Sequence, residues 1–370
     1  MRNLELIRRQ AGGKSGPVEV IAVVKADAYG HGAVEVSRAL VRERVKWLAV
    51  ACLEEALELE AAGVLGEARA LVLAPMQGDE ARELAERGFV AMLTSLSDFE
   101  LIESLESAGV EPPPLAVVID TGMGRMGLLP EEVSEAVRRL RSRPGRRVIG
   151  LFSHFPVADS FDEDNLEFTR RQLEDFRLLF EAMHRNFPGL SLVSIANSAG
   201  IFFHSASLMR AVRPGISLYG ARPEVELAGP EGLSPVMRWV TRIAQVRELP
   251  AGASISYGRR TVLTRRSRVA LLPVGYADGL KRRLPPGFPL LVHGKPAPLL
   301  GTITMDFTMI DVTDIPAAAA GDRVLLMGRE PGGGEVRAED HARAAGTIPY
   351  EVLTSVGKRV PRIYLTEEEA

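Results

Sequence analysis

A lysine at the end of a predicted core strand is the residue best suited to covalent chemistry in this chain. Lys25 follows the apolar, β-branched run Ile21–Val24, and a small glycine-rich turn comes next. Burial costs an ammonium group its hydration, so it lowers the lysine pKa and frees the amine to attack a carbonyl carbon. Lys25 is therefore a candidate Schiff-base lysine. The position also suits a lysine whose stem packs on the strand while its charge reaches water.

Further polar groups follow other predicted strands. They are Asp120 to Arg125, His154, Asn197 with Ser198, and Arg213 to Ile216. The Ser198 hydroxyl and the backbone N–H groups of Gly215 and Ile216 suit a phosphate, and a phosphate near a strand-end lysine is what pyridoxal phosphate requires. Each group also has a structural alternative: a helix cap at Asn197–Ser198, an ion pair at Arg213, a neutral hydrogen-bonded ring at His154. Only their occurrence together favours a site.

The elements that must position these groups form an alternating pattern in the first 223 residues. Eight β-rich runs are predicted as strands: Val18–Val24, Trp47–Ala51, Ala70–Leu73, Phe89–Met92, Leu115–Ile119, Val148–Ser153, Leu192–Ala196 and Arg210–Val212. Amphipathic helical segments lie between them, among them Leu53–Ala62, Asp79–Arg87, Pro130–Arg141 and Asn165–His184. This alternation predicts an α/β fold whose eight parallel strands close into a (β/α)8 barrel of the TIM type, with catalytic groups at the strand ends. A doubly wound open sheet is the alternative.

The pattern changes after about Pro223. From Pro235 to Met327 short strands follow one another, and a helical segment comes at about Arg337–Ala345. We therefore expect two domains: a barrel over residues 1–223 that holds pyridoxal phosphate, and a mostly β domain over residues 224–370.

Composition narrows the class of protein. The 370 residues are 46% hydrophobic and 25% charged with a net charge of −3, which gives no electrostatic case for nucleic acid or an anionic membrane as partner. Cys52 is the one cysteine, so an intrachain disulfide is impossible and the chain fits a reducing compartment. It has neither an apolar run long enough for a membrane span nor a signal peptide, so a cytoplasmic location is expected. No metal site is predicted.

Nine segments, in order along nearly the whole chain, resemble the alanine racemases, which are fold-type III pyridoxal phosphate enzymes. They are Val23–Gly32, Asp120–Gly127, Ser153–Phe155, Ala196–Ser198, Val212–Gly220, Ser256–Gly258, Pro273–Gly279, Thr304–Asp306 and Ile348–Glu351. The resemblance implies an isomerase that interconverts L-alanine and D-alanine and supplies D-alanine for peptidoglycan.

The resemblance also implies a pair of catalytic bases. Lys25 matches the residue that carries pyridoxal phosphate and acts as one base, and Tyr257 matches the base on the opposite face of the substrate α-carbon. A free tyrosine has a pKa of about 10, so such a base needs help near neutral pH. In the family a histidine and arginine relay supplies this help, and His154 matches the histidine.

Other matched residues would bind cofactor and substrate. Arg213 matches the donor to the pyridine nitrogen, and because an arginine keeps its proton, it suits proton exchange better than transamination. The cofactor-binding set implied is Lys25, Tyr29, His154, Asn197, Ser198, Arg213, Gly215, Ile216 and Tyr350. Arg125 and Met305 match the contacts to the substrate carboxylate. In the family, Tyr257 and Met305 come from a second subunit, so a homodimer with shared active sites is implied.

Two departures from the family pattern stand out. Val118 occupies the position where many relatives carry a carbamylated lysine that supports the substrate arginine, so Arg125 needs another support. The family also begins with a further strand upstream of the helix in which Met1–Leu4 lies, and we expect this chain either to manage without that strand or to start further upstream.

Three alternatives share parts of the pattern. An amino acid decarboxylase of the same fold is disfavoured by the motifs at Tyr257 and Met305 and by Arg213. A racemase of broader or different specificity, for serine or lysine, stays open. A non-catalytic barrel that only holds pyridoxal phosphate would lack the second domain.

Overall fold

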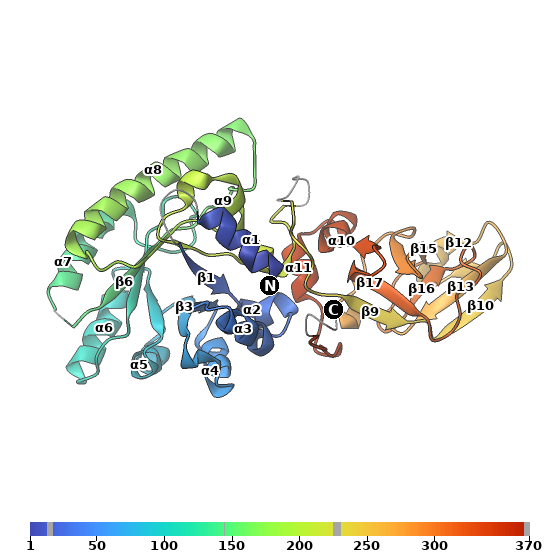
Figure 1. Ribbon diagram of the computed structural model, residues 1–370, viewed down its shortest axis with the longest axis horizontal. Helices are drawn as coiled ribbons and strands as arrows, with labels where there is room; N and C mark the ends of the chain where they lie inside the picture. The colour runs from blue at the N-terminus through green and yellow to red at the C-terminus, as the bar shows by residue number, and fades with distance from the viewer. Residues whose placement is uncertain (13–17, 144, 225–230, 366–370) are drawn as a thin grey trace. The chain divides into compact units, whose positions relative to one another are not determined.

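The computed structural model describes residues 1–12, 18–143, 145–224 and 231–365. The chain divides into two compact units (Figure 1). The first contains Met1–Ala28 and Ala33–Leu218, and the second contains Tyr29–Gly32 and Tyr219–Ala370. None of the helices in these described ranges is long and apolar enough to cross a membrane.

The first unit is built on a parallel sheet of eight strands. They are β1 (Glu19–Val23), β2 (Trp47–Val50), β3 (Arg69–Pro75), β4 (Val90–Leu93), β5 (Leu115–Val118), β6 (Val148–Phe152), β7 (Leu192–Ser194) and β8 (Ala211–Val212). The strands β1 to β7 lie side by side in chain order, and β8 pairs with β1. The Arg213 N–H donates to the Ala196 carbonyl at 2.9 Å, which joins the segments after β7 and β8. The predicted (β/α)8 barrel is confirmed, and the doubly wound alternative is wrong.

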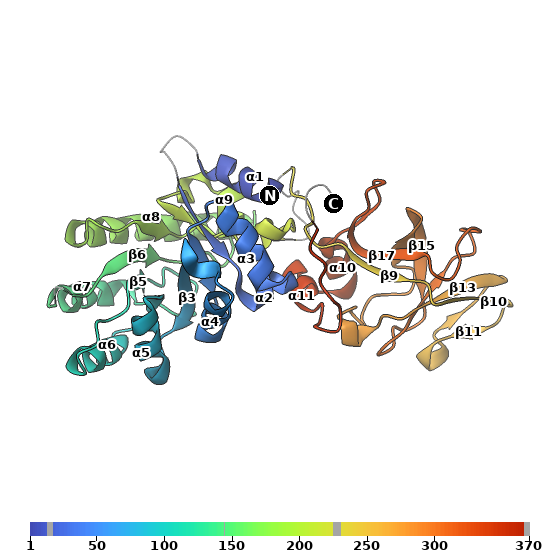
Figure 2. The same cartoon turned by 60° about the horizontal axis from the view of Figure 1, so that its bottom comes forward.

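Helices cover the outside of this sheet (Figure 2). They are α3 (Ala33–Arg42), α4 (Leu53–Ala61), α5 (Gly78–Arg87), α6 (Asp98–Ser107), α7 (Val133–Arg141), α8 (Glu163–Asn186) and α9 (Ser198–Phe203), preceded by α1 (Arg2–Ala11). Short 3₁₀ turns are η1 (Val64–Gly66), η2 (Pro130–Glu132), η3 (Ser205–Ser207) and η4 (Ile216–Tyr219). The strands β4 and β5 are buried along their whole length, as expected for parallel strands with side chains packed on both faces.

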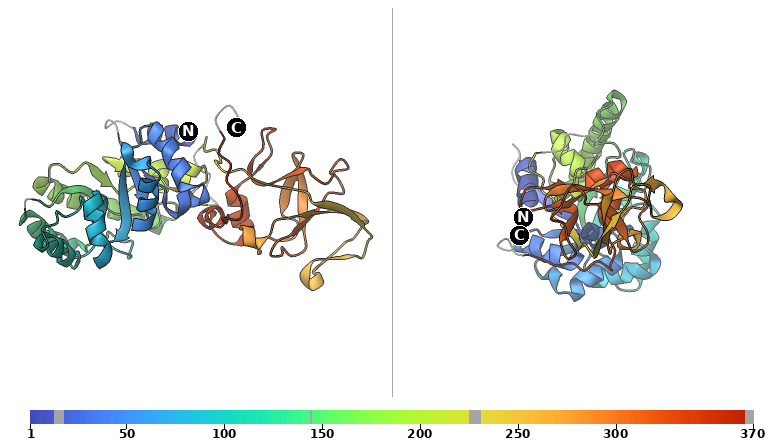
Figure 3. Two further views of the ribbon diagram at one scale, coloured as in Figure 1. Left: turned by 90° about the horizontal axis from the view of Figure 1, so that it is seen from below. Right: turned by 90° about the vertical axis from the view of Figure 1, so that its right-hand side faces the viewer.

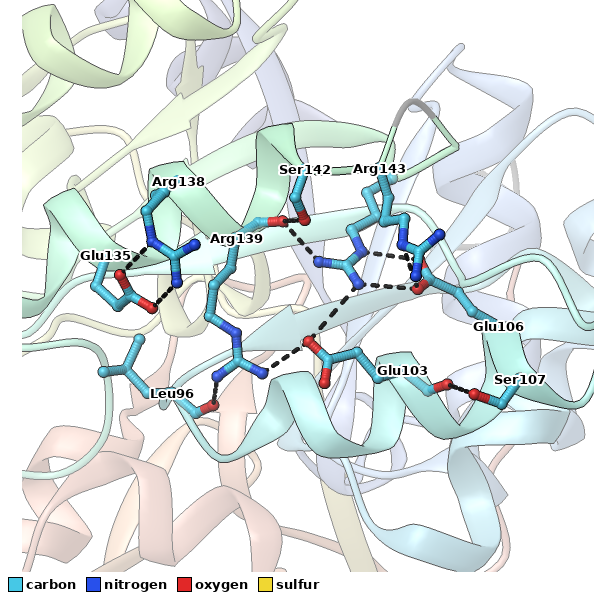
Figure 4. Close-up of polar contacts among 10 residues, drawn as sticks. Leu96, Glu103, Glu106, Ser107, Glu135, Arg138, Arg139, Ser142 and Arg143 are labelled. Atoms are coloured by element: carbon cyan, nitrogen blue, oxygen red, sulfur yellow. Dashed lines mark hydrogen bonds and ion pairs between the residues drawn. The ribbon is translucent and has the colours of Figure 1, made fainter.

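A network of ion pairs joins α6 to α7 and the loop that follows (Figure 4). The buried Arg146 guanidinium binds Glu106 through two hydrogen bonds of 2.8 Å each. Arg139 binds Glu103 at 2.7 Å, and its guanidinium carbon lies 4.4 Å from the ring centre of Phe99. Because Arg146 is buried, its pairing with Glu106 matters far more to stability than the exposed pairs on the same surface.

The segment after β1 departs from a simple glycine turn. Ala26 to Tyr29 have φ between 51° and 55°, and Gly30 has φ 79°, so α2 (Lys25–Gly30) continues as a left-handed helical turn. L-residues pay roughly 1–2 kcal/mol each for this conformation. The sequence predicts a turn here but does not reveal its handedness, because only Gly30 is a residue that favours positive φ.

The second unit is mostly β structure, as predicted. Its strands are β9 (Trp239–Arg242), β10 (Gln245–Leu249), β11 (Ser254–Ile255), β12 (Thr261–Val262), β13 (Ser267–Leu272), β14 (Pro289–Val292), β15 (Lys295–Leu300), β16 (Thr308–Asp311), β17 (Arg323–Arg329) and β18 (Glu335–Val336). The main sheet is antiparallel in the order β10-β13-β16-β15-β14-β17-β18, with β9 also paired to β17. The short hairpin β11–β12 stands out from it (Figure 3).

Two helices end the second unit. The predicted helix at Arg337–Ala345 is α10 (Ala338–Ala345), and α11 (Pro349–Thr354) follows it without having been predicted. Two 3₁₀ turns, η5 (Tyr257–Arg259) and η6 (Tyr276–Asp278), lie in the loops of the sheet.

Candidate active site

Lys25 lies two residues after the end of β1, at the carboxyl end of the barrel, and is half-buried. Burial lowers its pKa, and the positive charge of Arg125 lowers it further, while the Glu55 carboxylate opposes both effects. The lowered pKa enlarges the fraction of free amine near neutral pH, the form that attacks a carbonyl carbon or accepts a proton.

Arg213 follows β8 and is almost completely buried. Its Nη1 donates to the Ser194 carbonyl at 2.6 Å, its Nη2 donates to the Ser153 carbonyl, and its guanidinium carbon lies 4.9 Å from the ring centre of Phe152. Burial and the charge of Arg125 lower its pKa to about 9. Among the described residues, both terminal nitrogens of Arg213 bind main-chain carbonyls and no carboxylate contributes to its pKa shift, so the structural alternative of an ion pair is not what this arginine does.

His154 follows β6 and contacts Arg213. Burial, then the charges of Arg213, Arg125 and Lys25, lower its pKa to about 3, so the ring is neutral at neutral pH. Its Nδ1 lies 3.4 Å from Arg213 Nη2, which is a donor, so Nδ1 accepts and Nε2 carries the ring proton. The neutral, hydrogen-bonded ring expected for His154 is therefore present, and it is bonded to a second residue of the predicted site.

A cluster of donors surrounds Ser198 at the start of α9. The buried Ser198 Oγ accepts from the Gly215 N–H at 3.0 Å and the Ser217 N–H at 3.4 Å, and it lies 3.0 Å from the Ser217 hydroxyl. Two hydroxyls and two backbone N–H groups that converge in a buried place are the donor set a phosphate requires. Asn197 caps α9 by accepting from the Gly200 N–H at 2.9 Å, so its structural role is present as well.

The loop that carries Arg125 is organised by one carboxylate. Asp120 Oδ1 accepts from the N–H groups of Gly122 at 2.8 Å and Gly124 at 3.1 Å, and Oδ2 accepts from the Arg125 N–H at 3.2 Å. Val118 is buried at the end of β5. Asp120 thus fixes the main chain at Arg125.

The residues Lys25, Arg125, His154 and Arg213 come together at one end of the barrel. The charge of Arg125 lowers the pKa of the other three, and those of Arg213 and Lys25 also lower that of His154, whose Nδ1 lies 3.4 Å from Arg213 Nη2; the four side chains therefore lie close to one another. The positive charges of these basic side chains repel one another, and bound anionic groups such as a phosphate and a carboxylate would offset that repulsion.

Tyr29 and Tyr350 belong to the second unit, where they lie together. The Tyr29 ring stacks on that of Tyr219 with centres 4.9 Å apart, and the centre of the Tyr350 ring lies 6.0 Å from it. Burial raises the pKa of Tyr29 to about 12, so its hydroxyl keeps its proton and can donate a hydrogen bond.

Tyr257 and Met305 lie on loops of the second unit. Tyr257 is 73% exposed and Met305 is 53% exposed. Tyr257 is flanked by residues with positive φ, Ser256 at 61° and Gly258 at 75°, and the Ser256 hydroxyl donates to the Thr302 carbonyl at 2.6 Å. Strain of this kind persists where the surroundings hold the backbone, and it is typical of functional loops.

Sequence reasoning missed two residues that hold this site in place, Glu55 and Gln172, and it named Asp120 without its role. Asp120 holds the Arg125 loop, and Glu55 holds the turn that begins at Lys25. Gln172 of α8 donates to the Thr121 hydroxyl and to the His154 carbonyl, both at 3.3 Å. Glu55 gives a sequence signal, a glutamate in the first turn of a helix, whereas Gln172 gives none, because its partners are distant in sequence.

Comparisons with known proteins give consistent matches over the whole chain. The family model of the alanine racemase N-terminal domain matches residues 1–223, and that of the alanine racemase C-terminal domain matches residues 236–364. Alanine racemase 2 of Caldanaerobacter subterraneus subsp. tengcongensis is 37% identical over 370 residues, which is 100% of this chain and 93% of the relative.

Solved structures agree with these matches. The crystal structure of biosynthetic alanine racemase from Pseudomonas aeruginosa has a TM-score of 0.85 and 36% identity, covering 98% of this chain and 96% of that one. The crystal structure of the Bartonella henselae alanine racemase, which has covalently bound pyridoxal phosphate, has a TM-score of 0.85 and 30% identity, with coverage of 98% and 96%.

Proposed function

The chain belongs to the alanine racemase family and is a pyridoxal-phosphate-dependent isomerase of alanine, and we propose that Lys25 and Tyr257 are its two catalytic bases. The observation that carries the proposal is the cluster of Lys25, Arg125, His154 and Arg213 at the carboxyl end of the barrel, where these residues follow strand ends and His154 Nδ1 lies 3.4 Å from Arg213 Nη2. In this role the protein supplies D-alanine for peptidoglycan synthesis.

The residues of the barrel fit the cofactor. The donors around Ser198, from Gly215 and Ser217, suit its phosphate, and Ile216 follows Gly215 in the same turn. Arg213, a buried donor, suits the pyridine nitrogen. We propose that Lys25, Tyr29, His154, Asn197, Ser198, Arg213, Gly215, Ile216 and Tyr350 hold pyridoxal phosphate. When bound, the cofactor withdraws the electron pair left on the substrate α-carbon after loss of its proton.

The two bases act on opposite faces of that carbon. Lys25, with its lowered pKa, accepts the proton on one face, and Tyr257 donates one on the other face; the two exchange roles in the reverse direction. His154 is neutral and holds its Nδ1 toward Arg213, so its Nε2–H is available to a hydroxyl oxygen. We propose that this pair assists Tyr257.

Arg213 shapes the reaction outcome. With a pKa of about 9 it stays charged near neutral pH and acts as a donor without losing its proton. A pyridine nitrogen that only accepts a hydrogen bond draws electrons more weakly than a protonated one, which favours return of the proton over transamination.

The substrate carboxylate pairs with Arg125 in our proposal. Arg125 is exposed in the described chain and carries the fork geometry that matches a carboxylate. Asp120 fixes its main chain, and Met305 completes the contact.

We further propose a cytoplasmic homodimer in which Tyr257 of the partner subunit and the partner's Met305 complete each barrel. The exposure of Tyr257 and Met305, 73% and 53%, supports this, because a base must work away from bulk water. Residues 1–223 would then supply all of the proposed cofactor contacts except Tyr350, and residues 224–370 would supply Tyr350 and the second base. Sedimentation of the holoenzyme gives the oligomeric state, and a monomer that is fully active would contradict the shared site.

Racemisation in D₂O tests the assignment. Conversion of L-alanine to D-alanine should incorporate deuterium at the α-carbon, and Lys25→Ala should abolish both conversion and the visible absorbance of bound cofactor. Tyr257→Phe should remove exchange on one face only, so that exchange without inversion remains. Racemisation at the wild-type rate by Tyr257→Phe would overturn the two-base assignment.

A further inference from the structure

Glu55 binds the main chain at the ends of two barrel strands. Its Oε1 accepts from the Ala26 N–H at 2.7 Å, and its Oε2 accepts from the Ala51 N–H at 2.7 Å. Glu55 comes from the first turn of α4, whereas Ala26 follows β1 and Ala51 follows β2. One carboxylate therefore spans two neighbouring strand ends with both of its oxygens, each in a short, charge-assisted hydrogen bond.

The N–H at Ala26 belongs to the residue directly after Lys25. Ala26 is also the first of four consecutive L-residues with positive φ, which end at Tyr29. A run of this kind persists only where surrounding groups hold it. Asp27 supplies a second support, because its Oδ1 accepts from the Ala33 N–H at 2.7 Å at the start of α3.

Glu55 also acts on Lys25 through its charge. The charge of Arg125 lowers the pKa of Lys25 and the charge of Glu55 raises it, while the charge of Lys25 lowers the pKa of His154. Of these, Glu55 carries the negative charge, so it partly offsets the effects of burial and of Arg125.

We propose that Glu55 is a positioning residue for the reaction: its carboxylate holds the left-handed turn that presents the Lys25 amine. The proposal rests on the assignment of Lys25 above. Glu55 itself touches neither cofactor nor substrate in this role, and it acts through the main chain next to Lys25.

Three variants separate its effects. Glu55→Gln keeps the shape but loses the charge, and because an amide has a single acceptor oxygen, it keeps one of the two hydrogen bonds. Glu55→Asp keeps the charge but shortens the reach. Glu54→Gln is the matched control, since Glu54 is the exposed neighbour on the same helical turn.

The first measurement is hydrogen exchange of the full-length holoenzyme, followed by mass spectrometry of the peptide around Ala26. We expect faster exchange at Ala26 in Glu55→Gln and Glu55→Asp and no change in Glu54→Gln. The dissociation constant of pyridoxal phosphate, followed by its absorbance, should rise about tenfold in Glu55→Gln.

The second measurement is the pH profile of kcat. Removal of the negative charge lowers the pKa of Lys25 further, so the acid limb of Glu55→Gln should move to lower pH, while Glu55→Asp and Glu54→Gln keep it. A residue that only supports the fold would not move this limb. Wild-type exchange, cofactor affinity and pH profile in Glu55→Gln would overturn the proposal.

The two hypotheses fail in different ways. If peptide mapping after borohydride reduction finds the cofactor on a residue other than Lys25 in the wild-type protein, the assignment of Lys25 is wrong. If the cofactor is on Lys25 and the Glu55 variants behave as wild type, only the positioning role is wrong. If Glu55→Gln loses its fold by circular dichroism, Glu55→Asp carries the exchange and affinity tests.

Discussion

The donors around Ser198 give a prediction that can be worked out from the structure. In Ser198→Ala, the N–H groups of Gly215 and Ser217 lose the oxygen on which they converge, and the phosphate of pyridoxal phosphate loses one hydroxyl donor. A hydrogen bond to a charged group contributes about 1.5–3 kcal/mol, so the dissociation constant of the cofactor should rise about 10- to 150-fold. Because the site is buried, solvent cannot replace the missing donor fully.

Two assays measure this effect. Absorbance titration of the protein with pyridoxal phosphate gives the dissociation constant directly. Thermal or urea unfolding gives it by linkage: a ligand that binds only the folded state stabilises it by RT ln(1 + [L]/Kd), so a thirtyfold weaker affinity lowers that gain by about 2 kcal/mol at a fixed excess of cofactor. Because two buried N–H groups lose their acceptor, the protein without cofactor should itself lose about 1–3 kcal/mol of unfolding free energy, so the effect on binding is the difference between the curves with and without cofactor.

Ser205→Ala is the control, since Ser205 is an exposed serine in the 3₁₀ turn after α9. It should leave the dissociation constant within twofold of the wild-type value. The reasoning would be refuted if Ser198→Ala bound the cofactor as tightly as Ser205→Ala, because the converging donors at Ser198 would then have no part in phosphate binding.

Three further predictions concern stability, pH and substrate binding. Glu106→Ala removes both hydrogen bonds of 2.8 Å from the buried Arg146 guanidinium and leaves it the longer pair with Glu103 at 3.8 Å, so it should lower the free energy of unfolding by about 1.5–3 kcal/mol, and a loss below about 1 kcal/mol in urea unfolding would contradict this. Burial lowers the pKa of His341 to about 4, so between about pH 6.5 and pH 4 the unfolded chain binds a proton that the folded chain does not; stability should fall by up to about 1.4 kcal/mol per pH unit as the pH drops through that window, and the slope should be shallower in His341→Gln. Asp120→Ala frees the loop of Arg125 and should raise KM for alanine about tenfold while cofactor absorbance is kept; an unchanged KM in steady-state assays would show that the loop is held by other contacts.

Much of the barrel could be predicted because its elements are set by local pattern. The runs at Trp47–Val50 and Leu115–Val118 are apolar and short, and each leads to an amphipathic helix or a polar loop. The positions of the strand ends, and the polar residues that come after them, could therefore be predicted. The clustering of Lys25 and Arg213 then followed from the geometry of any closed parallel barrel.

The remainder depends on contacts distant in sequence. The handedness of the turn after Lys25 cannot be predicted from the local sequence, because Glu55, which holds the turn through the Ala26 N–H, lies 29 residues further along the chain. The stacking of Tyr29 on Tyr219 joins residues from different parts of the chain, and no periodicity reports it. The extra helix α11 is too short for an amphipathic pattern to stand out.

The left-handed turn after Lys25 has a consequence for the order of folding. Its residues prefer right-handed conformations in the unfolded chain, and its main support, Glu55, arrives only when α4 docks after β2. We therefore expect the lysine to take up its working position late, once the first two βα units have packed together. Cofactor capture should then lag behind formation of the helices during refolding, so that uptake of pyridoxal phosphate reports a correctly assembled barrel and not merely a collapsed chain.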